Sequence, residues 1–218
     1  MPLNPIPLGW RVAPPAELLS TGIPDVDAAL GGCPRGRITE IVGPPSSGRT
    51  SLLHSILAAS TGRQEFAVLV DTSDAFDPCS ASAAGVDLAK IIWIRCSGNA
   101  EHALRAADLV VQSGGFGVVA IDLADAKPAS LNRIPPTAWF RFRRSLESTP
   151  TVLVVLSAQP VTKSCSALLV EMKRRRAVFS GKKPFELLCG AEYDLHRRKP
   201  VSGERKGFLA RGIWTGTA

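Results

Sequence analysis

The sequence predicts an α/β fold: a mostly parallel sheet flanked by helices, with antiparallel strands along one edge. Short continuous apolar runs, typical of strands buried on both faces, alternate with helical segments up to about residue 160. A glycine-bounded loop joins the first of these runs to a helix, and three further sheet-forming stretches follow at 168–179, 185–195 and 207–214. Since alternation of strand and helix is typical of right-handed crossovers, the strands before residue 160 should lie parallel.

The length and composition favour one globular domain. A chain of 218 residues can bury one large core, so we expect a single domain over 18–218 after a proline-rich arm over 1–17. No segment approaches the ~20 apolar residues of a membrane span, and the N-terminus lacks the pattern of a signal peptide. The five cysteines are scattered without a C-x-x-C pair, which favours reduced core thiols. We therefore expect a cytoplasmic protein with no membrane partner, no zinc and no haem.

The first elements surround a phosphate-binding loop. A turn and a short helix are expected near 20–32, with Asp25 as N-cap and Gly31 as part of the stop. A strand over 37–42 and a helix over 51–57 then flank residues 43–50, which fit the spacing G-x-x-x-x-G-K-[ST] with arginine in place of lysine. In the intact motif, backbone N–H groups cradle phosphates and the last hydroxyl holds Mg²⁺. The predicted nucleotide-binding residues of this loop are Gly43, Ser46, Ser47, Gly48, Arg49 and Thr50.

The later apolar runs each end at a polar residue. Strands are expected over 66–70, 91–94, 118–121 and 152–156, and an amphipathic helix over 100–111. Ligands of open α/β sheets bind at the carboxyl ends of the strands, where Asp71, Asp122 and Gln159 are expected. Asp122 is a Walker-B candidate that would orient Mg²⁺ beside Thr50, and Gln159 is a further nucleotide-binding candidate.

Charge is distributed unevenly along the chain. Residues 1–140 carry 10 Lys and Arg against 13 Asp and Glu, whereas residues 141–218 carry 16 against 6, so their net charges are −3 and +10. A basic part from about residue 141 indicates a polyanionic partner, nucleic acid first, and the alternative is a solubilising surface. The DNA-binding candidates are Arg141, Arg143 and Arg144 on a predicted helix, and Lys173, Arg174, Arg175, Arg176, Arg197, Arg198 and Lys199 on predicted edge strands.

Aromatic residues interleave with the first three of these arginines. Trp139, Phe140 and Phe142 could form a platform on which bases stack. The alternative, which we favour, is a helix that buries its aromatic side on the sheet.

Several motifs together resemble the RecA recombinase family. Residues 20–22, 27–31, 36–44 and 46–48 are similar to the opening of the RecA core, and residues 70–78 to the segment after its second strand. Residues 118–122 resemble its Walker-B strand, and residues 152–159 the strand that ends in its nucleotide-sensing glutamine. The resemblance covers about 18–195 and implies a RecA-like P-loop NTPase core. It also implies ATP or ADP with Mg²⁺ at Thr50 and Asp122.

Four departures from the family pattern weaken the expected chemistry. Arg49 replaces the P-loop lysine, and a planar guanidinium cannot act as a compact ammonium between phosphates. The family's water-activating glutamate falls at Ser73, which leaves Asp74 as the only neighbouring candidate for a catalytic base, expected to point to the other side. The DNA-contacting loop after Gln159 is short, and the filament-forming N-terminal elements and C-terminal domain are reduced or missing. We therefore expect weak or no ATP hydrolysis.

A short, basic and degenerate RecA paralogue resembles the ImuA type. That resemblance implies a non-catalytic adaptor of the DNA damage (SOS) response, bound to DNA at the nucleoid. It would serve translesion synthesis with an ImuB-like polymerase-related protein, and RecA is a further candidate partner. Two alternatives stay open: a DNA-stimulated ATPase that acts as a recombination mediator, and an interaction scaffold that binds neither nucleotide nor DNA.

Overall fold

The computed structural model describes residues 17–181, 186–200 and 209–213, so the predicted arm over 1–17 lies almost wholly outside the described residues. The strands of the main sheet are β3 (Ile38–Val42), β4 (Phe66–Asp71), β5 (Ile91–Arg95), β6 (Phe116–Asp122), β7 (Val152–Ser157), β8 (Ser166–Ser180), β9 (Leu187–Lys199) and β10 (Leu209–Ile213). The helices are α1 (Pro24–Leu30), α2 (Arg49–Gly62), α3 (Pro78–Ala83), α4 (Ala100–Ser113), α5 (Pro128–Leu131) and α6 (Pro136–Leu146), with a 3₁₀ turn η1 (Leu88–Lys90). A separate antiparallel pair, β1 (Leu18–Leu19) and β2 (Cys33–Pro34), precedes β3.

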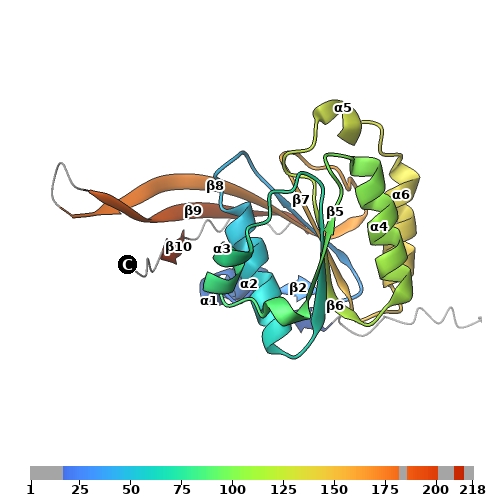
Figure 1. Cartoon of the computed structure of the whole chain (residues 1–218), viewed down its shortest axis with the longest axis horizontal. Helices are drawn as coiled ribbons and strands as arrows, with labels where there is room; N and C mark the ends of the chain where they lie inside the picture. The colour runs from blue at the N-terminus through green and yellow to red at the C-terminus, as the bar shows by residue number, and fades with distance from the viewer. Residues whose placement is uncertain (1–16, 182–185, 201–208, 214–218) are drawn as a thin grey trace, which may run out of the picture.

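The main sheet has the order β10-β9-β8-β3-β7-β6-β4-β5. Strands β8, β3, β7, β6, β4 and β5 run parallel, whereas β9 and β10 are antiparallel to their neighbours. Helices α1, α2 and α3 cover one face, and α4 and α6 cover the other (Figure 1). The predicted α/β class, with antiparallel strands at one edge of a mostly parallel sheet, is confirmed.

Each face of the sheet has its own apolar core. One core joins β3, β4, β6 and β7 to α2 through residues such as Leu53 and Ile56, and the other joins them to α4 and α6. Because β3 and β7 are covered on both sides, every residue of these strands is buried, which explains their continuous apolar runs. Strand β5 is different, since it lies at the sheet edge and Ile92 is 46% exposed. The expectation that this run is buried on both faces is wrong.

Two local predictions about helices have opposite outcomes. Helix α4 buries Ala103, Leu104, Ala107 and Val111 as expected, and the Asn99 side chain caps its first turn. Helix α1 begins after Ile23, not at Asp25, so the predicted N-cap is wrong. The neighbouring Asp27 carboxylate instead accepts hydrogen bonds from Ser20 and Thr21, which fixes the turn before the helix.

Helix α6 buries its aromatic side. Trp139 is 2% exposed and Phe142 0%, because both pack against the sheet, whereas Phe140 is 49% exposed. The favoured interpretation of this helix is confirmed. A base-stacking platform made of all three aromatic side chains is therefore wrong.

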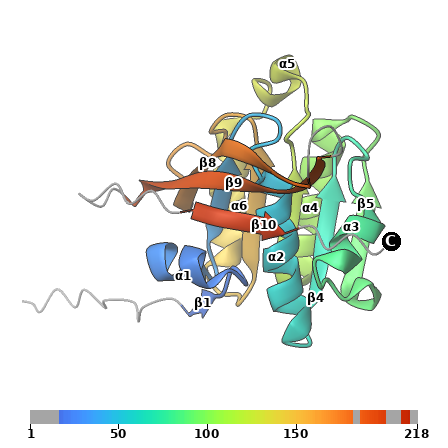
Figure 2. The ribbon, with the colours of Figure 1, turned by 90° about the vertical axis from the view of Figure 1, so that its left-hand side faces the viewer.

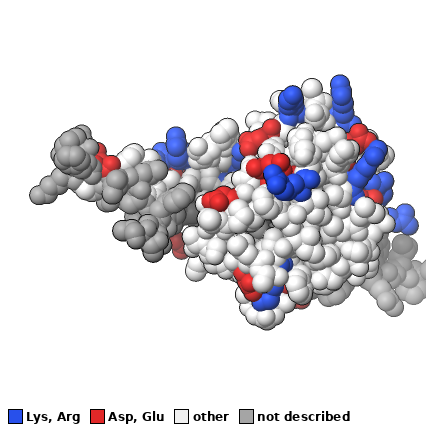
Figure 3. Space-filling view, in the orientation of Figure 1, with Lys and Arg blue, Asp and Glu red and all other residues white. Residues whose placement is uncertain are grey.

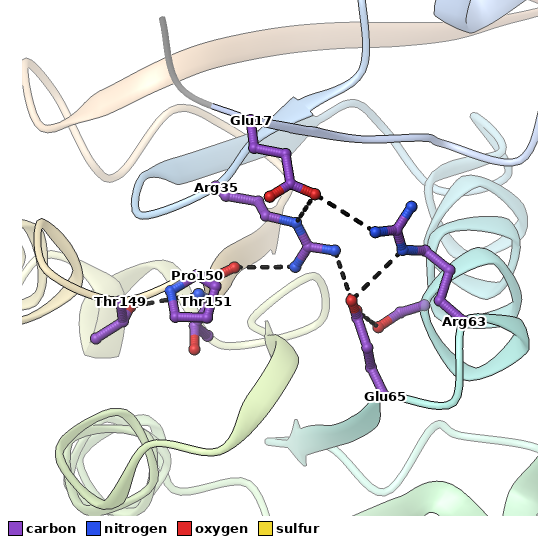
Figure 4. Close-up of polar contacts among 8 residues, drawn as sticks. Glu17, Arg35, Arg63, Glu65, Thr149, Pro150 and Thr151 are labelled. Carbon is purple, nitrogen blue, oxygen red and sulfur yellow. Dashed lines mark hydrogen bonds and ion pairs between the residues drawn. The ribbon is translucent and has the colours of Figure 1, made fainter. Parts of the chain in front are cut away.

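A charged network fastens the amino ends of the parallel strands (Figure 4). The buried Arg35 guanidinium donates to Glu65 at 2.6 Å and to the Pro150 carbonyl at 3.0 Å. Glu17 lies 3.5 Å from Arg35 and 3.4 Å from Arg63. These contacts join the β1–β2 pair to the end of α2 and the starts of β4 and β7.

Strands β8 and β9 extend past the parallel part of the sheet as a projection (Figures 1 and 2), and β10 pairs with residues 190–194 of β9 along it. Strand β3 pairs with β8 only as far as Glu171. Beyond that point, residues 172–180 of β8 pair with residues 187–195 of β9, and we call this section the ribbon. A β-bulge lies at Arg175, since Arg174 is opposite Tyr193 and Arg176 is opposite Glu192.

Candidate nucleotide site and basic surfaces

The glycine-bounded loop lies at the carboxyl end of the sheet, between β3 and α2, as predicted. Gly48 has a left-handed backbone (φ 89°) at the N-cap of α2, and Ser46 is also left-handed (φ 60°). The Ser47 N–H donates to the Pro44 carbonyl at 3.2 Å. A methyl group on Gly43 would lie 2.3 Å from the Met172 carbonyl oxygen, so only glycine fits there.

Two polar groups of this loop are buried without a hydrogen-bond partner in the described part of the chain: Ser47 Oγ and Arg49 Nη1. The Arg49 residue is 6% exposed, whereas Ser46 and Thr50 are exposed. A buried donor left unsatisfied costs about 1–3 kcal/mol, so it demands an explanation. Phosphate oxygens could accept from both groups, so the residues present fit a phosphate ligand.

Asp122 ends β6, where a Walker-B carboxylate is expected. Burial raises its pKa to about 6, and the charges of Asp71 and Asp125 act in the same direction. A hydrogen bond from the Ala124 N–H and the positive charge of Arg49 act in the opposite direction, to lower the pKa. The Asp122 carboxylate and the Thr50 hydroxyl suit Mg²⁺, which takes one or two protein ligands and completes its shell with phosphate and water. The described residues contain no group of three or more His, Cys, Asp or Glu that could hold a metal alone.

Asp71 ends β4, but its carboxylate is already engaged. It accepts from the backbone N–H groups of Ser73, Ala75 and Phe76 at 2.9–3.2 Å and from Trp93 Nε1 at 3.2 Å. The side chain is 1% exposed. Asp71 therefore shapes the turn after β4, which strand position alone does not reveal.

The segment after β4 offers no free carboxylate at the position where the resemblance to RecA implies a water-activating glutamate. Ser73 is exposed there. Asp74 has a left-handed backbone (φ 57°), and Arg95 Nε and Nη2 each donate to its carboxylate at 3.2 Å. Arg95 also lies over the Trp93 ring at 5.1 Å. Asp74 is thus held in an ion pair.

The short loop after β7 is held by hydrogen bonds to Glu40, a residue that was not among the predicted ones. Gln159 is exposed, and its backbone carbonyl accepts from Ser157 Oγ at 2.8 Å. Glu40, fully buried in β3, accepts from the Val161 N–H at 2.6 Å and the Thr162 N–H at 3.1 Å, and also from the Thr162 hydroxyl. A glutamate inside an otherwise apolar central strand was the available signal, because a buried carboxylate needs donors.

The predicted basic residues of α6 differ in how they are engaged. Arg141 forms an ion pair with Asp108 at 3.1 Å, and Arg143 lies 3.6 Å from Glu147. Arg144 is exposed and makes no ion pair with any described residue. Arg141 also lines a cleft of about 670 Å³ between the start of α4 and the α5–α6 segment, together with Arg105 and Arg133.

The predicted basic residues of β8 and β9 fall into two groups. The engaged ones contact neighbouring groups: Lys173 and Arg198 pair with Glu171 at 3.1 and 2.8 Å, Arg176 pairs with Glu192 at 2.6 Å, and Lys199 donates to the Ser164 carbonyl at 2.7 Å. Arg197 is half-buried. Arg174 and Arg175 are exposed, and neither has an ion pair within the described ranges.

The basic residues of α6 and those of the ribbon lie at opposite ends of the long axis of the molecule. Helix α6 is at one end and the ribbon at the other (Figure 1). Lys and Arg side chains gather over the end with α4, α5 and α6, and a separate, smaller group lies toward the ribbon (Figure 3). The predicted candidates of α6 and those of the ribbon therefore belong to two surfaces, whereas Arg197 and Lys199 lie outside the ribbon, opposite Val170 and Leu169.

Comparison with known proteins agrees with this architecture. Residues 6–131 match the family model described as the RecA N-terminal domain, which is more than half of the chain. The chain belongs to the RecA family. In its RecA-type core, arginine replaces the lysine of the glycine-bounded loop, and Asp74 forms an ion pair with Arg95. Among the described residues, no helix is long and apolar enough to cross a membrane.

Individual RecA proteins are similar over part of their length. Protein RecA of Rickettsia prowazekii is 33% identical over 166 residues, 69% of this chain and 48% of that protein. Protein RecA of Kineococcus radiotolerans is 38% identical over 117 residues, 53% of this chain and 33% of that protein. Protein RecA of Streptomyces venezuelae is 42% identical over 118 residues, 53% of this chain and 31% of that protein. The chain thus spans half or less of the length of these relatives.

Proposed function

We propose that this RecA-family chain is a DNA-binding accessory protein of the DNA damage response, with weak or no ATP hydrolysis. It would act in the cytoplasm at the nucleoid, as an adaptor in translesion synthesis. Its partners would be DNA, an ImuB-like polymerase-related protein and RecA.

One observation carries the catalytic part of this proposal. Ser73 occupies the position of the family's water-activating glutamate, and the adjacent Asp74 carboxylate is bound by Arg95 at two atoms. A general base must reach the proton that it removes, and an ion-paired side chain has to leave its partner first. These observations support a loop that keeps groups suited to bind phosphate, Arg49 and Ser47, while the described segment after β4 offers no free carboxylate to activate water.

A nucleotide test separates binding from turnover. Calorimetry with MgADP should show binding that weakens in Asp122→Ala, while phosphate release stays near the protein-free rate with or without single-stranded DNA. Arg49→Lys restores the compact ammonium and should strengthen binding without restoring turnover, because position 73 is unchanged. DNA-stimulated phosphate release that Asp122→Ala abolishes would instead favour the recombination mediator.

The DNA part of the proposal is supported by exposed, uncompensated charge. Arg174 and Arg175 on the ribbon and Arg144 on α6 are exposed and make no ion pair within the described part of the chain. Such residues bind phosphates without sequence preference, and log affinity then falls linearly with log salt. Arg176 is unsuitable for a test, because reversing its charge would leave the 3%-exposed Glu192 facing a like charge.

A charge-reversal test shows which of the two basic surfaces binds DNA. It also distinguishes DNA binding from the alternative of an interaction scaffold that binds no DNA. The pair Arg174→Glu and Arg175→Glu should reduce the retention of single-stranded DNA, and Arg144→Glu reports the α6 surface by itself. A wild-type chain that retains no DNA at low salt would favour the pure interaction scaffold.

The partner test uses the ImuB-like protein of the same genome. The two purified proteins should form a complex that survives gel filtration. Absence of association in purified form would remove the translesion role and leave DNA binding to be judged by its own experiment.

A further inference from the structure

The phosphate-binding loop is in contact with both strands of the ribbon. A methyl group on Gly48 would lie 2.8 Å from ring carbons Cδ1 and Cε1 of Tyr193, so the ring packs against the loop where any other residue would carry a side chain. At the other end of the loop, the Met172 carbonyl on β8 occupies the same kind of position beside Gly43. The loop thus touches β9 through a ring and β8 through a backbone group.

Tyr193 lies among the ribbon's charged residues. It is opposite Arg174 in the β8–β9 register, so both side chains are on one face of the ribbon. The preceding residue, Glu192, accepts two hydrogen bonds from Arg176, of 2.6 and 2.8 Å. The bulged Arg175 is between these two pairs. The ring is therefore adjacent to the unpaired arginines that the proposed function assigns to DNA.

The Tyr193 ring and the 43–50 loop are packed too closely to move independently of each other. Gly48 is the N-cap of α2, and its carbonyl accepts from the Leu52 N–H at 3.0 Å. A phosphate that recruits the buried Ser47 hydroxyl and Arg49 guanidinium would act on residues adjacent to Gly48. Packed groups shift between discrete arrangements instead of deforming smoothly, so such an adjustment would be transmitted to the ring.

We propose that Tyr193 is a positioning residue that couples occupancy of the 43–50 loop to DNA binding by the ribbon. The coupling rests on the proposed nucleotide and DNA binding, and it assigns the connection between them to one ring. By thermodynamic reciprocity, nucleotide changes the affinity for DNA by the same factor as DNA changes the affinity for nucleotide.

The first test needs no ligand. Hydrogen exchange of the amides at 48–52 in the full chain should be several-fold faster in Tyr193→Ala than in wild type. Tyr193→Phe keeps the ring, removes only the hydroxyl, and should match wild type. Equal exchange in the alanine variant and wild type would overturn the positioning role.

The second test uses the fact that the chain contains a single tyrosine. Incorporation of 3-fluorotyrosine gives one ¹⁹F resonance, which should shift on addition of MgADP and on addition of oligo(dT). The ratio of oligo(dT) affinities with and without MgADP should differ from 1 by about 5-fold or more in wild type and Tyr193→Phe, and fall to about 1 in Tyr193→Ala.

The outcomes separate this inference from the proposed function. MgADP that binds by calorimetry without moving the ¹⁹F resonance overturns the coupling and leaves nucleotide binding intact. A ratio that stays unchanged in Tyr193→Ala does the same. Failure of MgADP to bind the wild-type chain removes the nucleotide part of the proposed function and the coupling together, while hydrogen exchange still decides whether the ring positions the loop.

Discussion

The parallel core and the ribbon belong to the same sheet but are stabilised differently. Strands β3 and β7 are flanked by strands on both sides and by helices on both faces, and all their residues are buried. On the ribbon, residues 173–176 of β8 are all exposed; three of them pair with residues 192–194 of β9, and the fourth, Arg175, is the bulge. The core therefore constrains residue identity through packing, whereas the ribbon leaves its side chains available for contacts with other molecules.

This difference explains how the loop can keep its shape while its chemistry changes. Gly43 and Gly48 are demanded by close backbone and ring contacts, so the structure itself requires them. Under the proposed function, a RecA-type core thus persists after loss of the groups needed for hydrolysis.

The largest expected effect tests the core. Phe142→Ala removes a fully buried ring between α6 and the sheet and should lower the free energy of unfolding by about 3–5 kcal/mol. Phe140→Ala on the same helix is the matched control, since Phe140 is 49% exposed, and should cost less than about 1 kcal/mol. Urea unfolding measures both. Equal losses would contradict the assignment of one buried aromatic side.

A somewhat smaller effect is expected at the amino ends of the strands. Arg35→Ala removes the buried guanidinium that donates to the Pro150 carbonyl and to Glu65, which keeps only the Ser60 hydroxyl and the more distant Arg63, and should lower the free energy of unfolding by roughly 2–4 kcal/mol. Arg37→Ala, which removes a half-exposed guanidinium 3.7 Å from Glu147, should cost under about 1 kcal/mol. The same urea titration compares them, and a cost at Arg37 equal to that at Arg35 would refute the buried network.

The pH dependence of stability gives a third test. The pKa of Asp122 is about 6 in the folded chain, above its ordinary value of 3.8, so the folded state binds the proton more tightly than the unfolded state. Ionisation of this group therefore lowers stability as pH rises from about 4 to about 6. Asp122→Asn should flatten that slope, whereas Asn in place of the exposed Asp25 should not. Unfolding midpoints of wild type and both variants, measured at several pH values, test this prediction.

The smallest effect on stability is expected on the ribbon. Arg174→Glu should change the free energy of unfolding by less than about 0.5 kcal/mol, because the side chain is exposed. It should nevertheless weaken DNA binding and reduce the log–log salt slope by about 1. Lys90→Glu makes the same charge change beside Asp87, on the 3₁₀ turn η1, and should leave DNA binding nearly unchanged. Equal losses from both variants would point to net charge, not to the ribbon.

Local patterns predicted most of the core. The period of apolar residues located α4, the continuous runs located β4, β6 and β7, and the glycine spacing located the loop between β3 and α2. These features depend on neighbours within a few residues, so sequence records them directly. The three stretches at the C-terminal side were predicted as strands for the same reason. Strands β9 and β10 are antiparallel to their neighbours as expected, but β8 runs parallel to β3, so the expectation that all three are antiparallel is wrong.

The features that sequence could not give depend on contacts between distant residues. Ile92 is exposed because β5 lies at the sheet edge, which follows from strand order. Asp71 is engaged by a turn and by Trp93, and Glu40 by residues more than 120 positions later in the chain. The separation of the basic residues into two surfaces likewise requires the path of the chain through space.

The charged network around Arg35 has a mechanical consequence for α2. Arg63, the C-cap of this helix, and Glu65 just beyond it belong to that network, so the far end of the helix is clamped. Its other end begins at the 43–50 loop, whose Gly48 is the N-cap of the helix and packs against Tyr193. The C-terminal end of the helix is thus held in place by ion pairs. A movement of the 43–50 loop would therefore displace the N-terminal end of the helix, which faces the ribbon.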